Sequence, residues 1–288
     1  MEASNKAQTF FVATDGSDAS ELAFQVCAKD MMREDIDHIV VGHISDKKKD
    51  YLPWNMKPQY VNDIYEAKVM PFGKHGRYAH REKEESQTSK EAVWALAEFE
   101  KASIIVVGNH GRKGPKADLT VCGTAIEFLS LNSKFPCLII KDRKARSQKP
   151  DGALRWGVCY DGSDKAKEAL ELTLKTMRTN DKLAVVTVKD AKVDNEDVVK
   201  AHVKNMCEKY EITKVEVTIL DKEEGKSVYQ VIKKYLKYQA SDITKHGYID
   251  FVTVGNTGVN FSSYNKKYLG SVAEAVLRAR LMNCLLVI

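Results

Sequence analysis

An internal repeat is the feature of this sequence that most constrains its fold. The tetrapeptide Asp-Gly-Ser-Asp at 15–18 recurs at 161–164, which is 146 residues later. Val-Gly-Asn at 107–109 recurs at 254–256, and a glycine followed by Thr or Ser occurs at 123 and again at 270, each 147 residues later. Several matches in the same order at an almost constant offset indicate duplication of a whole domain, because the period is far longer than that of a solenoid repeat.

The repeat divides the 288 residues into two domains of ordinary size. Between the two copies, the segment 142–153 is charged and contains Pro150 and Gly152, a composition typical of an exposed linker. We therefore predict a first domain at 1–145 and a second domain at 152–288.

Short apolar segments alternate with segments of helical periodicity in both copies. Strands are expected at 9–14, 38–44, 103–107 and 137–140, and then at 156–160, 183–188, 215–220, 249–254 and 284–288. Helices are expected from about 17 to 27, at 90–101, 124–131, 163–177, 196–210, 228–239 and 271–280. This alternation predicts the α/β class, with a parallel sheet covered by helices on both faces. The pattern is weakest over 45–83, where we predict a helix near 61–69 and a strand near 77–81.

Composition narrows the class of protein. Hydrophobic residues make up 43% of the chain and the net charge is only +5, with no basic segment interleaved with aromatic residues. No apolar run approaches the length of a membrane helix, and the first residues do not resemble a signal peptide. We therefore expect a cytoplasmic protein that binds neither nucleic acid nor membranes. The 6 cysteines form no Cys-x-x-Cys pair, which favours buried thiols over zinc ligands or disulfides.

Glycines follow the fourth expected strand of each copy. Gly108 and Gly111 would let the backbone approach a ligand, and Gly123-Thr124 would open a helix, whose free N–H groups favour an anion. Ligands in such sheets bind at the carboxyl ends of the strands, where Asp15 also lies. The competing interpretation is that these glycines only form turns. The basic residues of the two glycine loops are candidates to neutralise phosphate charge: Arg112, Lys113, Lys116, Lys266 and Lys267.

The order of Asp-Gly-Ser, Val-Val-Gly-Asn-His-Gly and Gly-Thr resembles the universal stress protein family over nearly the whole chain, twice. This resemblance implies two tandem doubly wound domains, each a Rossmann-like, adenine nucleotide alpha hydrolase-like fold of strand order 3-2-1-4-5. It also implies ATP, with or without Mg²⁺, as the ligand. Carried over by position, the nucleotide would contact Asp15, Ile44, Gly108, His110, Gly111, Gly123 and Thr124 in the first copy, and Asp161, Val188, Gly255, Gly258, Gly270 and Ser271 in the second.

The loops depart from the family's ATP-binding pattern. That pattern has nine residues between its second and third glycines, whereas eleven stand here at 112–122 and at 259–269. Two residue roles also stay open. His110 would contact phosphate or would be an exposed loop residue, and Asp15 would lie near the ribose or would only fix the turn that precedes the helix.

The resemblance implies a stress-linked regulator or sensor that binds an adenine nucleotide. The residues add that turnover should not be rapid, because no Ser, His and Asp combination suggests a catalytic centre. The alternative is an interaction or structural subunit that keeps the fold without the nucleotide. In that case the segment 45–83, rich in Tyr, Trp and Pro, would bind a protein partner. A third possibility, an enzyme of the adenine nucleotide alpha hydrolase-like class, lacks the added signatures of such enzymes. The resemblance further implies pairing of the two domains, or a homo-oligomer, through the last strands.

Overall fold

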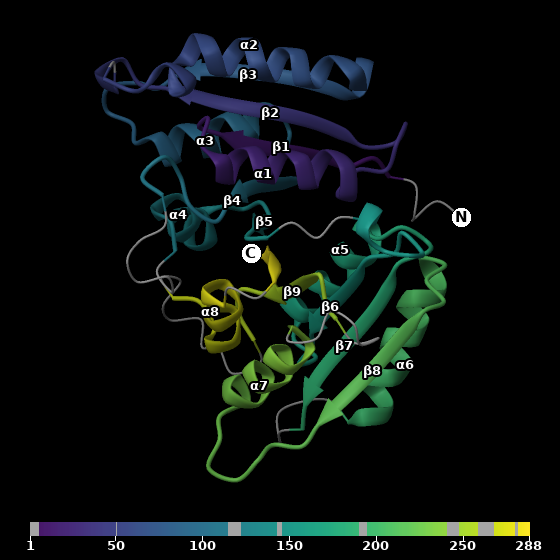
Figure 1. The fold of residues 1–288 in the computed structure, drawn as a ribbon. Coiled ribbons are helices and arrows are strands. Elements are labelled where there is room, and N and C mark those ends of the chain that lie inside the picture. Colours follow the sequence, from purple (N-terminus) through teal and green to yellow (C-terminus); the bar gives the residue numbers. More distant parts are fainter. Residues whose placement is uncertain are drawn as a thin grey trace. The chain divides into compact units, whose positions relative to one another are not determined.

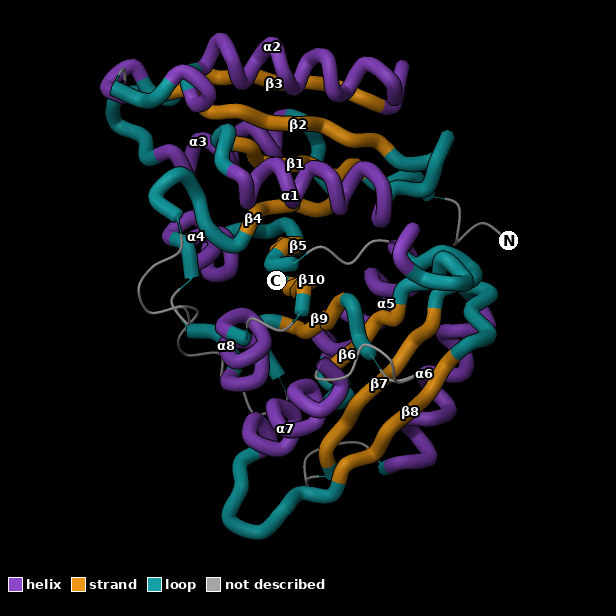
Figure 2. The backbone as a smooth tube through the Cα atoms, viewed as in Figure 1, coloured by secondary structure: helices purple, strands orange, loops and turns teal. Residues whose placement is uncertain are grey.

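The chain divides into two compact units, one of Ala7–Arg143 and one built mainly from Lys144–Ile288. The computed structural model describes residues 6–49, 51–114, 122–142, 146–189, 195–240, 248–258, 268–279 and 282–288. Each unit is a parallel sheet with helices on both faces (Figures 1 and 2). The α/β class expected from the sequence is therefore confirmed.

The first unit contains five parallel strands in the order β3-β2-β1-β4-β5. Their bounds are β1 (Thr9–Thr14), β2 (His38–Ser45), β3 (Gly76–Glu82), β4 (Ile104–Gly108) and β5 (Cys137–Ile140). This is the predicted order 3-2-1-4-5. The strand order changes direction at β1, since β2 and β3 lie on one side of it and β4 and β5 on the other. The loops that follow β1 and β4 therefore border the crevice where ligands of such folds bind.

The helices of the first unit begin where the sequence supplies caps. Ser17 accepts a hydrogen bond from the backbone N of Ser20 at the start of one helix, and Thr88 forms a capping box with Glu91 at another. Right-handed crossovers place the first two α-helices on one face of the sheet and the last two on the other. These helices are α1 (Asp18–Val26), continued by a π-helical turn (Cys27–Met31), α2 (Pro58–Val69), α3 (Ser89–Phe99) and α4 (Thr124–Asn132).

The second unit repeats the arrangement, with parallel strands in the order β8-β7-β6-β9-β10. Numbered within the unit, this is again 3-2-1-4-5. The strands are β6 (Arg155–Cys159), β7 (Lys182–Val188), β8 (Val215–Leu220), β9 (Phe251–Gly255) and β10 (Asn283–Val287). The helices are α5 (Asp164–Thr176), α6 (Glu196–Lys209), α7 (Val228–Ala240) and α8 (Ser271–Arg278). Figure 1 shows α7 and α8 on the opposite face of this sheet from α6.

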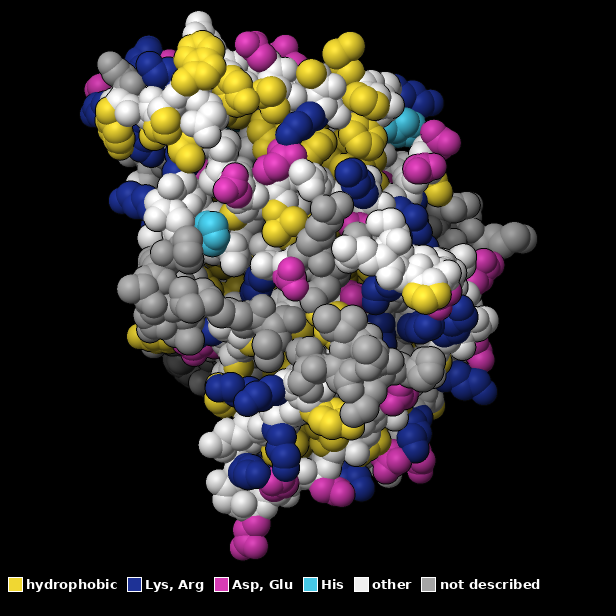
Figure 3. Space-filling model, in the orientation of Figure 1, with side chains coloured by type: hydrophobic (Ala, Val, Ile, Leu, Met, Phe, Trp, Pro, Cys, Tyr) yellow, Lys and Arg dark blue, Asp and Glu magenta, His cyan; other side chains and the backbone are white. Residues whose placement is uncertain are grey.

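The segment 45–83 contains the helix and the strand predicted there, α2 and β3, each a few residues longer than expected. Three short 3-10 turns complete it, at Lys47–Lys49, Trp54–Met56 and Met70–His75. Several of its apolar side chains are exposed: Tyr51 by 79%, Trp54 by 62% and Met70 by 75%. Hydrophobic side chains gather over α2 on the face shown in Figure 3.

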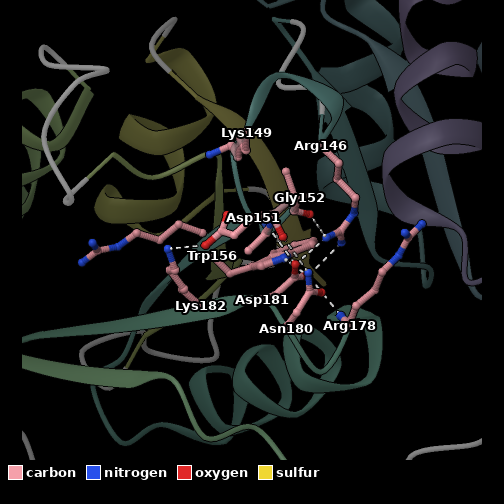
Figure 4. A network of polar contacts seen from close by, with 12 residues as sticks. Arg146, Lys149, Asp151, Gly152, Trp156, Arg178, Asn180, Asp181 and Lys182 are labelled. Carbon is pink, nitrogen blue, oxygen red and sulfur yellow. Dashed lines mark hydrogen bonds and ion pairs between the residues drawn. The ribbon is translucent and has the colours of Figure 1, made fainter.

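Most described residues of the linker between the sequence repeats are exposed, as its composition suggested, but Arg146 is an exception. Arg146, in a 3-10 turn (Arg146–Gln148), is buried and forms two hydrogen bonds with the carboxylate of Asp181, at 2.5 and 2.8 Å (Figure 4). Asp181 is fully buried and also accepts hydrogen bonds from the backbone N of Leu154 and of Arg178, at 2.9 and 3.0 Å. The linker residue thus completes a buried polar network of the second unit, because an arginine can be buried when its charge and donors are matched.

The first unit has an equivalent network made without a linker. Asp37 accepts from the backbone N of Gln8 and of Arg33, each at 2.9 Å, and the Arg33 guanidinium binds the same carboxylate. In both units a buried aspartate ties the start of the first strand to the turn that precedes the second.

The apolar cores consist mainly of the inner strands, which are buried on both faces as parallel sheets require, whereas β3 and β8 are only partly buried. Five of the six cysteines, all but Cys122, are also buried. Among the described residues, no helix is long and apolar enough to cross a membrane.

Candidate functional site

Asp15 ties the two loops that border the crevice of the first unit. Its Oδ1 accepts hydrogen bonds from the backbone N and the hydroxyl of Ser17, at 3.1 and 2.6 Å. Its Oδ2 accepts from the backbone N of Arg112 at 2.9 Å. A Cβ atom on Gly111 would lie only 2.8 Å from this Oδ2, so the glycine is required for the loop after β4 to approach the carboxylate.

The second unit repeats this contact. Asp161 Oδ1 accepts from the backbone N and the hydroxyl of Ser163, at 3.1 and 2.6 Å. A Cβ atom on Gly258 would lie 2.5 Å from Asp161 Oδ2. In both units, therefore, the aspartate fixes the turn after the first strand and lies against the glycine loop.

Gly108 and Gly255 have a different role, in packing. A Cβ atom on Gly108 would lie 2.4 Å from the carbonyl O of Ala19 in α1, and one on Gly255 would lie 2.8 Å from Cβ of Lys165 in α5. These glycines let a helix pack directly against the end of the fourth strand. Helix packing therefore accounts for glycine at positions 108 and 255 without a ligand.

Two helices, α4 and α8, begin at the crevice without a side-chain cap. Their N-cap residues are Gly123 and Gly270, which have no side chain to bond the first-turn N–H groups. The first helical residues, Thr124 and Ser271, are exposed. An uncapped helix N-terminus leaves N–H donors and the positive end of the helix dipole for an anion.

A cavity of about 320 Å³ opens at the carboxyl ends of the strands in the second unit. It is lined by all six residues that the sequence assigned to this copy, Asp161, Val188, Gly255, Gly258, Gly270 and Ser271. The sequence did not single out the other lining residues, which include Tyr160, Val228, Ile232, Thr257 and Leu269. Its volume lies within the range of small-molecule sites.

The chemistry of this cavity changes from one side to the other. Near α8 it presents backbone amides, with the Ser271 hydroxyl at the first position of the helix. Near β7 and α7 it is apolar, with Val188, Val228 and Ile232 on its wall. No histidine, lysine or arginine lines it among the described residues, and Lys266 and Lys267 lie outside them.

In the first unit the structure places the candidate residues around the same strand ends. Gly123 lies close to the glycine loop in space, since a Cβ atom there would lie 3.5 Å from the carbonyl O of Asn109 and 3.7 Å from Cα of His110. His110 Nδ1 is buried with no hydrogen-bond partner among the described residues. Ile44 lies near the end of β2 and is 9% exposed. Lys116 lies outside the described residues.

A histidine that the sequence did not single out, His43, is fully buried near the end of β2. Its Nε2 lies 3.3 Å from Nη2 of Arg112, and its Nδ1 lies 3.5 Å from Asn62 Oδ1 and 3.3 Å from the Tyr78 hydroxyl. Burial, and then the charge of Arg112, lower the pKa of His43 to about 4. The ring is therefore neutral at pH 7.

This lowered pKa predicts a pH dependence of stability. Between pH 6.5 and 4 the unfolded chain protonates His43 and the folded chain does not, so the free energy of unfolding falls as the pH falls through this range. Above pH 6.5 His43 is neutral in both states and contributes no slope. We expect the loss of stability from this titration to be about 3 kcal/mol over that range.

The measurement is urea denaturation between pH 4 and 7 of the native chain and of His43→Thr, which introduces the residue found at the equivalent position 187. The variant should lose less stability on acidification than the native chain. Parallel pH profiles would show that His43 does not titrate differently in the two states.

Comparison with known proteins agrees with this architecture. Residues 6–141 match the model of the Universal stress protein family. The crystal structure of a universal stress protein from Archaeoglobus fulgidus DSM 4304 covers 99% of this chain and 97% of that chain with a TM-score of 0.57, at 18% identity. At that identity the likeness shows the fold. Comparison with curated proteins gives no significant sequence match.

A second solved structure, a putative aspartate carbamoyltransferase from Leishmania major Friedlin, matches at 14% identity over 88% of this chain and 74% of that chain. Its TM-score of 0.22 is too low to bear on the fold. The family match over residues 6–141, by contrast, spans all five strands of the first unit and its glycine loop. Residues 6–141 therefore form a domain of the universal stress protein family.

Proposed function

We propose that the second domain binds an adenine nucleotide such as ATP, and that the protein is a regulator or sensor that turns the nucleotide over slowly, if at all. Family membership by itself supports a regulator-like role in the stress response. The observation that carries the nucleotide proposal is the cavity of the second domain, which combines an uncapped helix N-terminus with an apolar wall.

The two sides of the cavity suit the two ends of a nucleotide. The N–H groups at the start of α8 and the Ser271 hydroxyl would bind phosphate oxygens, which the positive end of the helix dipole favours. The apolar wall formed by Val188, Val228 and Ile232 would contact the base. Gly258 and Gly270 would let the loop backbone lie close to its neighbours at the cavity, because a Cβ atom on Gly258 would clash with Asp161 Oδ2 and one on Gly270 would lie 3.4 Å from the carbonyl O of Asn256.

The described lining residues also support slow turnover. Asp161 is the one carboxylate among them; its Oδ1 already accepts two hydrogen bonds from Ser163, and its Oδ2 lies against the backbone of Gly258. A general base needs a free position within reach of the proton it removes, and a histidine is the usual choice. We therefore assign Asp161 to holding the glycine loop in place, and not to proton transfer.

Ser271→Glu tests the nucleotide proposal in the full-length protein. A glutamate at the first position of α8 is compatible with the helix dipole, so the fold should be kept. Its carboxylate would stand beside the amides that bind phosphate and repel it. We expect ATP affinity at this site, measured by isothermal titration calorimetry, to fall at least ~10-fold, equivalent to about 1.4 kcal/mol.

Ser89→Glu is the matched control, because Ser89 is the first residue of α3, whose N-terminus is closed by the Thr88 capping box. It adds the same charge at the same helical position away from the glycine loops, and should leave ATP binding unchanged. If the native chain binds no ATP, or if both variants behave alike, the proposal is wrong.

The alternative function, an interaction subunit without a nucleotide, is favoured by the exposed side chains of Tyr51, Trp54 and Met70. The same titration separates the two. A chain that binds no adenine nucleotide at either domain would leave the surface of 45–83 as the functional feature. In that case Trp54→Ser would weaken association with a partner without changing the melting temperature.

A further inference from the structure

Arg112 connects three elements of the first domain. It directly follows Gly111, and its backbone N donates to Asp15 Oδ2 at 2.9 Å. Its side chain then turns back across the crevice, where Nε donates to the carbonyl O of Asp15 and Nη2 lies 3.3 Å from Nε2 of His43. The guanidinium therefore spans the carboxyl ends of two neighbouring strands, β1 and β2.

His43 is a suitable acceptor for this guanidinium. Its pKa of about 4 keeps the ring neutral at pH 7. On the Nδ1 side it faces the amide oxygen of Asn62, which can only accept a hydrogen bond. The proton is thus favoured on Nδ1, and Nε2 is left to accept from Arg112. Among the described residues, no carboxylate forms an ion pair with the Arg112 guanidinium, so neutral acceptors hold it.

The equivalent strand ends of the second domain line the cavity. There, Tyr160 and Asp161 follow β6, and Val188 ends β7. The counterpart of Arg112, 147 residues later, is Val259, and the counterpart of His43 is Thr187. Val259 lies outside the described residues, but a valine is too short to span two strand ends and has no donor for such a bridge. Among the described residues, such a bridge is found in the first domain, and the sequence places no arginine at the equivalent position of the second.

We propose that Arg112 makes the first domain the weaker nucleotide site, because its guanidinium must leave the rim between β1 and β2 before the base of a nucleotide can enter. The nucleotide then fills the second domain first. This inference rests on the proposed function. In this inference Arg112 sets the relative ATP affinity of the two domains through the base position alone. It does not affect the phosphate position at Gly123 and Thr124.

The test is Arg112→Val, which introduces the residue of the second domain, combined with Ser271→Glu to suppress the second site. We expect the full-length double variant to bind ATP at least ~10-fold more tightly than Ser271→Glu alone in a calorimetric titration. The sign of the change is decisive. Removing a positive charge that contacts phosphate would weaken the binding of an anion, whereas removing a side chain that covers the base position should strengthen it.

Adenosine and inorganic tripolyphosphate separate the two ends of the ligand. In the double variant, adenosine affinity should rise and tripolyphosphate affinity should not. Lys113→Val in the same background is the matched control, because Lys113 is an exposed cation of the same loop, and it should not increase ATP affinity.

An unchanged or lowered ATP affinity after Arg112→Val, with the melting temperature retained, overturns the role of Arg112. The same holds for a native chain whose two sites bind equally well. By contrast, absence of ATP binding to the native chain would refute the proposed function itself, so the two failures can be told apart.

Discussion

Replacing Asp181 by alanine is expected to lower the free energy of unfolding of the second domain by about 3–5 kcal/mol. The carboxylate is fully buried, and the substitution takes away the ion-pair partner of Arg146. It also removes the acceptor of the backbone N–H groups of Leu154 and Arg178. Removing one member of a buried, hydrogen-bonded ion pair costs far more than the pair itself contributes, because the remaining charge stays out of water.

The change can be measured by urea denaturation in a Trp54→Phe, Trp94→Phe background, in which Trp156 reports on the second domain. Asp151→Ala is the matched control, since Asp151 forms an ion pair with Lys182 in the same network at 2.8 Å but both side chains are over 40% exposed (Figure 4). That loss should stay below about 1 kcal/mol. Equal losses in the two variants would mean that the Asp181 network is not buried in solution.

Substituting alanine for Gly108 is expected to destabilise the first domain by about 3 kcal/mol or more. The new Cβ atom would lie 2.4 Å from the carbonyl O of Ala19 and 2.5 Å from its carbonyl carbon, and both are backbone atoms that cannot rotate away. To relieve the contact, α1 must move off β4. Thermal or urea denaturation of the full chain gives the magnitude.

Gly123→Ala is the comparison for this glycine, because its Cβ atom would meet no atom closer than 3.5 Å and its φ of −62° suits any residue. We expect a loss of at most about 1 kcal/mol, which reflects the poorer N-cap quality of alanine. If Gly108→Ala is as well tolerated as Gly123→Ala, the packing role assigned to Gly108 is wrong. The expected difference between the two variants would separate a glycine required by the fold from one available to a ligand.

Much of the fold could be predicted because parallel strands buried on both faces have continuous apolar sequences, as in 104–108 and 251–255. The strand β3 was harder to recognise. It is only partly buried, it alternates between half-buried and exposed residues, and short 3-10 turns surround it. The repeat itself compensated for weak local signals, since a strand recognised in one copy locates its counterpart in the other.

The candidate site was predicted less completely, and the reason differs between residues. The glycines and Asp15 stand out because turns and helix starts select these residue types locally. By contrast, the contact between Arg112 and His43 joins residues far apart in the sequence, and neither belongs to a motif. Asp37 and Asp181 resemble ordinary turn residues until their burial is known. Such pairings depend on three-dimensional proximity, which periodicity does not encode.

The position of Arg146 has a practical consequence for dividing this protein. Sequence similarity places the start of the second repeat after Pro150. Arg146, whose guanidinium neutralises the Asp181 carboxylate of the second domain, precedes that point. A recombinant fragment that starts at Gly152 would retain Asp181 and lack Arg146. An autonomous second half should therefore begin upstream of Arg146, and homologous domains exchanged at the apparent junction would inherit the same electrostatic defect.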